Sequence, residues 1–405
     1  MRKDLRGCGK TFRLLQMKTN RRDFVKLTGT AGTGIILSGM TSCITQPHDG
    51  DIKFISPVDG DMLNDYDGIL TEEGLMVTVK ISAPERSRIK VNGIKARRVD
   101  DIFHADILLR NYSNTIELSE GRSDKKQVIT IFRLKNYTNK YRLSLDDNIW
   151  FLKDISENSA RYNSIFDNLY VGFLKEVHDS YGTKIHINIY YQTKGFNLSQ
   201  MTEKFKDEWK RNSDWLRLSF HALQNDPDKP YISAGYDEVK RDCEMVKAQI
   251  RRFAGEELLS PVTTLHWGEA TVEGCRALHD SGYKALAGYF NIEEGHPVVS
   301  YYLDNAKTEH LGSRSIWCDN AEGIIFKKIN MVINLYRMDE IVPLLEELKR
   351  DPHKSGFVDL MIHEQYFYPF YVDYQPDFRQ KVLTAVRWAS ENDYQPAFLS
   401  ECIFS

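Results

Sequence analysis

The chain has 405 residues, of which 41% are hydrophobic, 12% aromatic and 27% charged, and this composition excludes a disordered, collagen-like or low-complexity protein. Its 54 basic and 57 acidic residues are unevenly distributed, because the first 43 residues hold nine of the basic and two of the acidic ones. The remaining 45 basic and 55 acidic residues give the body of the chain a formal charge of −10, which argues against a nucleic-acid partner.

The N-terminal segment is typical of an export signal. The motif Arg21-Arg22-Asp23-Phe24-Val25-Lys26 resembles the twin-arginine export consensus. An apolar stretch follows at residues 27–40, shorter than the roughly 20 residues that a membrane-spanning helix needs. Both Met1 and Met17 lie upstream of the arginine pair, and the sequence leaves open which of them starts the protein.

The apolar stretch ends at Met40-Thr41-Ser42-Cys43, which resembles a loose lipobox. The alternative for Cys43 is an incidental thiol beside an ordinary cleavage site. We expect lipidation of Cys43, with residues 1–43 as the signal and residues 44–50 as a polar tether. The expected location is therefore outside the cytoplasm, as a periplasmic or cell-surface lipoprotein of a bacterium that contacts the membrane only through its lipid anchor.

Residues 51–137 are expected to form a small all-β domain. Short alternating runs of apolar and polar residues predict strands at 52–55, 75–81, 102–107, 114–118 and 128–132. Asn92-Gly93 is a dipeptide that favours a tight hairpin turn. The segment resembles the immunoglobulin-like sandwiches that precede catalytic domains in exported bacterial carbohydrate enzymes.

Residues 138–405 are expected to form the catalytic domain. Strands are predicted at 141–145, 184–191, 216–220, 262–266, 285–289, 298–303, 324–329, 358–362 and 397–399. Helices are predicted at 164–180, 237–253, 271–281, 338–350 and 376–392. This alternation predicts an α/β fold, a (β/α) barrel or a distorted version of one, with catalytic groups at the C-terminal ends of the strands.

Four of the predicted strands end in acid–base or metal-ligating side chains. Each such residue alone is more often structural, but their recurrence at corresponding strand ends indicates a site. In chain order the strand ends supply Asp146 and Asp147, then His221 with Asn225 one helical turn later, then His266, Trp267 and Glu269, then His363 and Glu364. His186 and Asn188 lie in the middle of a strand and are expected to pack inside the barrel.

An aromatic run follows His363 directly. Its amphipathic rings suit a sugar-binding wall. We expect Trp267, Glu364, Tyr366, Phe367 and Tyr368 to contact the substrate.

Residues 141–404 resemble the polysaccharide deacetylases with the NodB-homology domain, carbohydrate esterase family four. Ser144-Leu145-Asp146-Asp147 corresponds to that family's Thr-Phe-Asp-Asp segment, which implies a general base at Asp146 and a metal ligand at Asp147. The segment from His221 to Asn225 corresponds to its His-x-x-x-His ligand motif, with Asn in place of the second His. Met361-Ile362-His363 corresponds to its Leu-x-His motif, which implies that His363 is the general acid.

The segment Leu265-His266-Trp267-Gly268-Glu269 corresponds to the family's Arg-Pro-Pro-Tyr-Gly segment but lacks the arginine that orients the base, so His266 or Glu269 is expected to act catalytically instead. The resemblance implies a distorted deacetylase barrel, a divalent metal ion with zinc as the expected one, and a polysaccharide or glycan substrate. The implied activity is metal-dependent hydrolysis of N- or O-acetyl groups by an exported hydrolase.

Two alternatives stay open. In a glycoside hydrolase built on the same barrel, Asp146 would pair with Glu269 or Glu364 as acid and base. A glycan-binding lipoprotein without catalysis would keep the barrel as a scaffold. Metal dependence distinguishes the deacetylase from the first, and loss of activity on substitution of Asp146 distinguishes it from the second.

Overall fold

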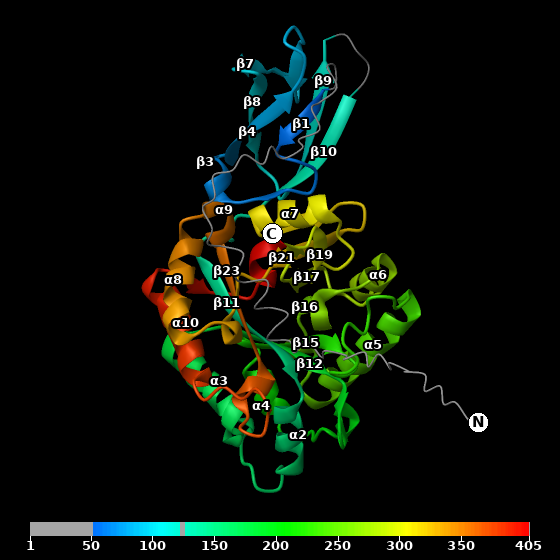
Figure 1. Cartoon of the computed structure of the whole chain (residues 1–405), viewed down its shortest axis with the longest axis vertical. Coiled ribbons are helices and arrows are strands. Elements are labelled where there is room, and N and C mark those ends of the chain that lie inside the picture. The colour runs from blue at the N-terminus through cyan, green and yellow to red at the C-terminus, as the bar shows by residue number, and fades with distance from the viewer. Residues whose placement is uncertain (1–51, 122–125, 405) are drawn as a thin grey trace, which may run out of the picture. The chain divides into compact units, whose positions relative to one another are not determined.

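The computed structural model of this chain describes residues 52–121 and 126–404 (Figure 1). The twin-arginine motif, Cys43 and the tether lie outside the described residues, and their roles stay predictions. Within the described ranges, no helix is long and apolar enough to cross a membrane.

The N-terminal part consists of two five-stranded sheets that enclose one apolar core. The first sheet contains β1 (Lys53–Ser56), β3 (Ile69–Leu70), β4 (Leu75–Ser82), β7 (Arg97–Val99) and β8 (Ile102–Leu109). The second contains β2 (Met62–Leu63), β5 (Ile89–Val91), β6 (Ile94–Lys95), β9 (Ser113–Glu120) and β10 (Lys126–Arg133).

Period-2 patterning explains this sandwich. In β4 every second side chain is buried, and the intervening ones face outward, so each sheet has one apolar face to cover. Asn92 and Gly93 join β5 to β6 with φ of 48° and 77°, the left-handed backbone that a tight hairpin requires. The predicted strands are confirmed, and the immunoglobulin-like assignment stays a prediction.

The remainder of the chain contains two further sheets. A six-stranded parallel sheet consists of β11 (Lys140–Asn148), β12 (Ile185–Tyr190), β15 (Leu216–Ala222), β22 (Met331–Val332), β23 (Phe357–His363) and β24 (Gln395–Pro396). A four-stranded sheet consists of β16 (Val262–Thr264), β17 (Ala285–Gly288), β20 (Ile316–Asp319) and β21 (Ile324–Lys328). Two short hairpins add β13 (Gln192–Thr193) with β14 (Phe196–Asn197) and β18 (Asn291–Glu293) with β19 (His296–Val298).

These two separate sheets do not confirm the expected (β/α) barrel or its distorted version. Among the described residues, no ladder joins β15 to β16 or β21 to β22. Hydrogen bonds that involve side chains connect β16 to the larger sheet instead. The Thr263 hydroxyl donates to the carbonyl of Phe220, and the amide of Thr264 donates to the side chain of Asn188. The order of the strands still brings the ends of β11, β12, β15 and β16 together, so the site keeps the arrangement of a βα fold.

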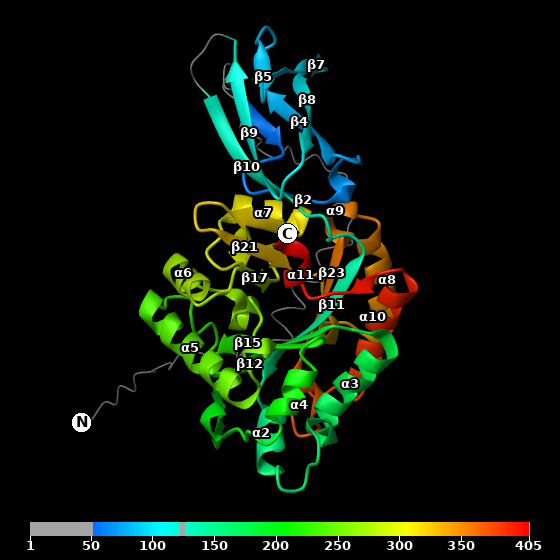
Figure 2. The ribbon, with the colours of Figure 1, turned by 180° about the vertical axis from the view of Figure 1, so that it is seen from behind.

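Helices flank both sheets, with α3, α8 and α10 on one side and α5 and α6 on the other in both views (Figures 1 and 2). The helices are α2 (Trp150–Glu157), α3 (Leu169–Tyr181), α4 (Lys206–Arg211), α5 (Tyr236–Phe253), α6 (Val272–Asp280), α7 (Asn305–Arg314), α8 (Met338–Lys349), α9 (Pro352–Ser355), α10 (Phe378–Glu391) and α11 (Ser400–Ile403). All five predicted helices are confirmed, whereas α2, α4, α7, α9 and α11 were not predicted.

The predicted strands at 298–303 and 397–399 are wrong, since β24 ends at Pro396 and α11 begins at Ser400. β19 ends at Val298, and Val299 and Tyr301 have φ of 51° and 54°, a conformation that an extended strand cannot contain. The amide of Val299 donates to Glu269 at 2.7 Å, which turns this segment back toward the end of β16.

The expected boundary at residue 137 is crossed by apolar contacts. Met62, Leu134 and Tyr137 share a buried cluster with Val262 and Phe357 of the larger part. The division of the chain into separate domains at residue 137 therefore stays a prediction. The four cysteines of the described part, Cys243, Cys275, Cys318 and Cys402, are buried thiols without a disulfide, as expected for small apolar residues.

Candidate active site

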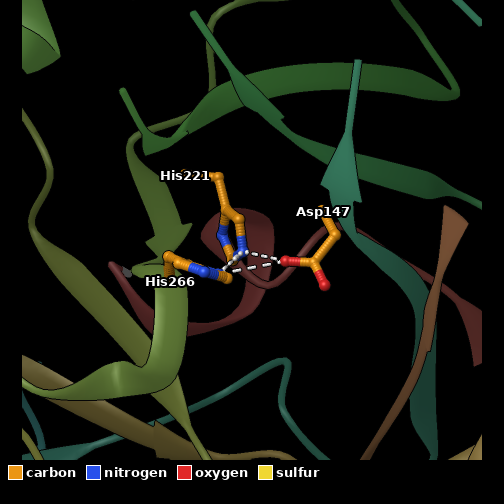
Figure 3. A group of neighbouring side chains, drawn as sticks. All are labelled: Asp147, His221 and His266. Atoms are coloured by element: carbon orange, nitrogen blue, oxygen red, sulfur yellow. Dashed lines mark hydrogen bonds and ion pairs between the residues drawn. The ribbon is translucent and has the colours of Figure 1, made fainter. Parts of the chain in front are cut away.

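Three buried side chains from separate strand ends converge at one point (Figure 3). Asp147 lies near the end of β11, His221 lies in β15, and His266 lies two residues after the end of β16. Oδ1 of Asp147 lies 3.0 Å from Nε2 of His221 and 3.1 Å from Nδ1 of His266, and these two nitrogens are 3.3 Å apart. Asp147 and His221 thus meet as the sequence predicted.

A bulge at the end of β11 allows two consecutive carboxylates to reach this end of the sheet. The register with β12 shifts between Leu145 and Asn148, and Asp147 has φ of 65°. Successive side chains of a regular strand point to opposite faces, and a bulge re-aims them. As a result, Asp146 and Asp147 contact two side chains from the same face of β12, Asn188 and Tyr190 respectively.

Hydrogen bonds to backbone carbonyls fix which nitrogen of each imidazole carries the proton. Nδ1 of His221 lies against the carbonyl oxygen of Thr264, and Nε2 of His266 lies 2.9 Å from the carbonyl oxygen of Asn225. A carbonyl oxygen only accepts, so these two nitrogens carry the protons. When the two rings are neutral, as metal binding requires, their other nitrogens present lone pairs to each other and to Asp147.

This donor set fits a divalent metal ion. Two imidazoles and one carboxylate are ligands that zinc and related transition metals prefer. Ligand atoms about 2.0–2.1 Å from a tetrahedral zinc ion lie about 3.3–3.4 Å apart, and the observed separations are 3.0, 3.1 and 3.3 Å. A cation between the three lone pairs would relieve their mutual repulsion, so the geometry favours an ion at this point.

Tyr190 belongs to the site, although the sequence analysis did not single it out. Its hydroxyl donates to Oδ1 of Asp147 and lies 2.9 Å from Nδ1 of His266. Tyr190 has the same strand parity as His186 and Asn188, so the alternation of β12 was the signal that could have identified it.

Asn225, the expected third ligand, lies beside the three converging residues. Its side-chain oxygen accepts from the side-chain amide of Gln365 at 3.0 Å and lies 3.3 Å from the hydroxyl oxygen of Tyr190. The third nitrogen close to Asp147 and His221 belongs to His266, which the sequence analysis placed among the catalytic residues. The ligand role of Asn225 stays a prediction that competes with His266.

Asp146 and His363 lie next to each other at the ends of two paired parallel strands, β11 and β23, where they are register partners. Oδ1 of Asp146 accepts from the side-chain amide of Asn188 at 2.6 Å. Nδ1 of His363 lies 2.9 Å from Oδ1 of Asn334, which also accepts from the His363 backbone amide. Since Oδ1 of Asn334 accepts there, Nδ1 of His363 donates the hydrogen of this bond.

Glu269 and Glu364 contact backbone amides instead of the three converging residues. Glu269 accepts from Val299 and lies 3.7 Å from Nζ of Lys229, and burial raises the pKa of Glu269. The carboxylate of Glu364 accepts from the amides of Ile149, Trp150 and Phe151, the first turn of α2. Both carboxylates therefore hold backbone amides in this structure.

A cavity of about 290 Å³ opens beside Asp147. Its lining includes the rings of Trp150 and Tyr371 and the amides of Gln192, Gln224 and Gln365. Aromatic rings with a few amides suit the apolar faces and hydroxyl groups of a sugar.

Three of the residues expected to contact the substrate pack against the aromatic rings that line the cavity, or against each other. Tyr366 is buried and packs edge-on against Tyr371, with ring centroids 5.5 Å apart. Tyr368 packs against Trp150 in the same way at 5.5 Å, and Phe367 packs against Tyr368. The ring of Trp267 lies edge-on to the ring of His266, with centroids 6.2 Å apart.

A scan against protein families and a search of curated proteins find no match for this chain. Among solved structures it is similar to a Mycobacterium smegmatis protein assigned as a polysaccharide deacetylase, with 10% identity and a TM-score of 0.39 over 66% of this chain and 88% of that one. It is also similar to Agd3, described as a novel carbohydrate deacetylase, with 8% identity and a TM-score of 0.36 over 82% of this chain and 65% of that one. These values do not place the chain in a family, so its chemistry is inferred from the site.

Proposed function

We propose that this protein is a metal-dependent carbohydrate deacetylase that hydrolyses N- or O-acetyl groups of a polysaccharide or glycan. The observation that carries the proposal is the convergence of Asp147, His221 and His266 beside the Asp146–His363 pair. Metal ligands next to a base and an acid suit metal-dependent hydrolysis of an acyl group.

Asp147, His221 and His266 would hold the ion, expected to be zinc. Such an ion polarises a carbonyl group and lowers the pKa of water. The carbonyl oxygens of Thr264 and Asn225 orient the two imidazoles, and Tyr190 orients the carboxylate, so the ligands are arranged before substrate arrives.

Asp146 accepts the proton of the attacking water, whose oxygen forms a bond to the acetyl carbonyl carbon. His363 donates a proton to the nitrogen or oxygen that leaves when the C–N or C–O bond breaks. Acetate and a free amine or hydroxyl group are the products. The position of Asp146 and His363 as strand neighbours supports this division of roles.

Trp150 and Tyr371 would hold the sugar ring next to Asp147. Neither charged side chains nor a basic patch dominates the cavity lining, which favours a neutral glycan over a polyanionic one. Export through the twin-arginine route and anchoring through Cys43 would place the enzyme where such polysaccharides occur. Substitution Cys43→Ser should then release the protein from membranes, and membrane retention of that variant would argue against the lipid anchor.

The experiment is a measurement of acetate released from an N-acetylglucosamine oligomer and from an O-acetylated xylan, before and after chelation. We expect release that is lost with a chelator and restored by zinc. New reducing ends without acetate would indicate the glycoside hydrolase. Glycan binding without either product, unchanged by Asp146→Asn, would indicate the non-catalytic lipoprotein.

A further inference from the structure

A line of buried polar side chains crosses the interior of the larger sheet and ends at Asp146. Arg142 on β11 forms a two-point ion pair with Asp359 on β23, with Nε–Oδ1 and Nη2–Oδ2 distances of 3.0 and 2.8 Å. Nη1 of Arg142 also lies 2.7 Å from Nδ1 of His186. Both members of the ion pair are at most 1% exposed, so no water competes for these bonds.

Arginine fixes the direction of this line because its guanidinium only donates. Nδ1 of His186 must therefore accept, and the proton of the neutral ring is on Nε2, 2.8 Å from Oγ of Ser219. Oγ of Ser219 accepts the hydrogen bond from Nε2 of His186. The hydroxyl hydrogen of Ser219 is donated to Oδ1 of Asn188. Burial and the charge of Arg142 lower the pKa of His186, in agreement with a neutral ring.

A second contact fixes the same orientation of Asn188. The backbone amide of Thr264 lies 3.3 Å from Oδ1 of Asn188, and a backbone amide only donates. Oδ1 of Asn188 therefore faces Ser219 and Thr264, and the NH₂ group faces Asp146, 2.6 Å from its Oδ1. If the amide were flipped, its NH₂ group would meet two donors and its oxygen would meet a carboxylate.

We propose that Asn188 is a positioning residue for Asp146, held in one orientation by a directed chain of hydrogen bonds that begins at Arg142 and passes through His186 and Ser219. The inference rests on the proposed function, because it takes Asp146 as the base. The proposal assigns to Asn188, on β12, the role of orienting Asp146. The sequence analysis had named only His266 or Glu269 as replacements for the missing arginine. Those two residues contact other groups in this structure.

The kinetic test compares Asn188→Leu and Ser219→Ala with Ser144→Ala. Ser144 is an equally buried serine on β11 whose hydroxyl lies 3.4 Å from the carbonyl of Leu360, outside the chain of bonds. On an N-acetylglucosamine oligomer we expect kcat to fall about 10- to 100-fold in Asn188→Leu and about 3- to 10-fold in Ser219→Ala, with KM within about twofold of the wild type. Zinc content should not change. Wild-type kcat in Ser219→Ala, or a kcat that falls only together with zinc content, would overturn the proposal.

A spectroscopic test does not depend on activity. With ¹⁵N-labelled histidine, we expect the wild-type His186 ring to be neutral with its proton on Nε2, its signals to move in Ser219→Ala, and the same neutral Nε2–H form to be kept in Ser144→Ala, although Ser144 is the register partner of His186. A proton on Nδ1, or a charged ring at neutral pH, would overturn the chain of bonds. Should the wild type release no acetate while these signals follow expectation, the proposed reaction fails and the directed chain to Asn188 is supported.

Discussion

Oδ1 of Asp147 lies 3.0 Å from Nε2 of His221, although 74 residues separate them in the chain and they belong to different strands. His266 completes the group, and Asn225 contacts it from the side. Two residues thus compete for the third ligand position, and the structure favours the imidazole.

Substitution of each ligand should remove the metal. We expect Asp147→Ala, His221→Ala and His266→Ala to reduce zinc from about one ion per chain to a small fraction, because two remaining ligands hold zinc poorly. Asn225→Ala should keep most of the zinc and is the matched control. Elemental analysis of the purified proteins checks this, and stoichiometric zinc in His266→Ala together with its loss in Asn225→Ala would return the third position to Asn225.

Asp146→Asn and His363→Gln should separate catalysis from metal binding. Removal of a general base or acid costs about 10²- to 10⁴-fold in rate, so we expect kcat to fall by that factor for acetate release while zinc content stays that of the wild type. Asn334→Ala, which removes the acceptor for Nδ1 of His363, should lower kcat by a smaller factor. Full activity in Asp146→Asn would contradict its role as base.

Trp150 should contribute to substrate affinity. Trp150→Ala removes one wall of the cavity, and loss of an aromatic stacking surface is expected to raise KM about tenfold. Trp150→Phe keeps an aromatic ring and should recover most of the affinity. Steady-state kinetics on an acetylated oligomer provide the measurement, and an unchanged KM in Trp150→Ala would show that the substrate binds elsewhere.

Glu364 should make stability depend on pH. Burial raises the pKa of Glu364 to about 7 from an ordinary value of 4.5, so the folded state disfavours its ionised form. Between these values the folded state binds the proton more tightly than the unfolded state does. The free energy of unfolding should therefore fall as pH rises from about 4.5 to about 7, by about 3 kcal/mol at most.

Glu364→Gln should remove that decline, and urea unfolding at pH 5 and pH 8 measures it. The exposed Glu391 provides the control, since Glu391→Gln should keep the wild-type difference between the two pH values. An equal pH dependence in wild type and Glu364→Gln would contradict the prediction.

The sequence by itself determined the local elements of this protein. Alternating apolar residues specified β1, β4, β8, β9 and β10 of the N-terminal sandwich, and helical periodicity specified α3, α5, α6, α8 and α10. It also placed Asp146, Asp147, His221, His266 and His363 at strand ends, because a polar residue directly after an apolar run is visible without any long-range information.

The tertiary structure alone decided how those residues combine. Whether His266 or Asn225 approaches Asp147 depends on how β16 lies against β15, where side-chain hydrogen bonds replace a ladder. Helix α2 could not be predicted because Ile149 at its start offers no capping side chain, and Glu364, more than 200 residues away, accepts its first amides. The orientation of Asn188 depends on Arg142, Ser219 and Thr264, which lie on three other strands, and no local pattern records such contacts.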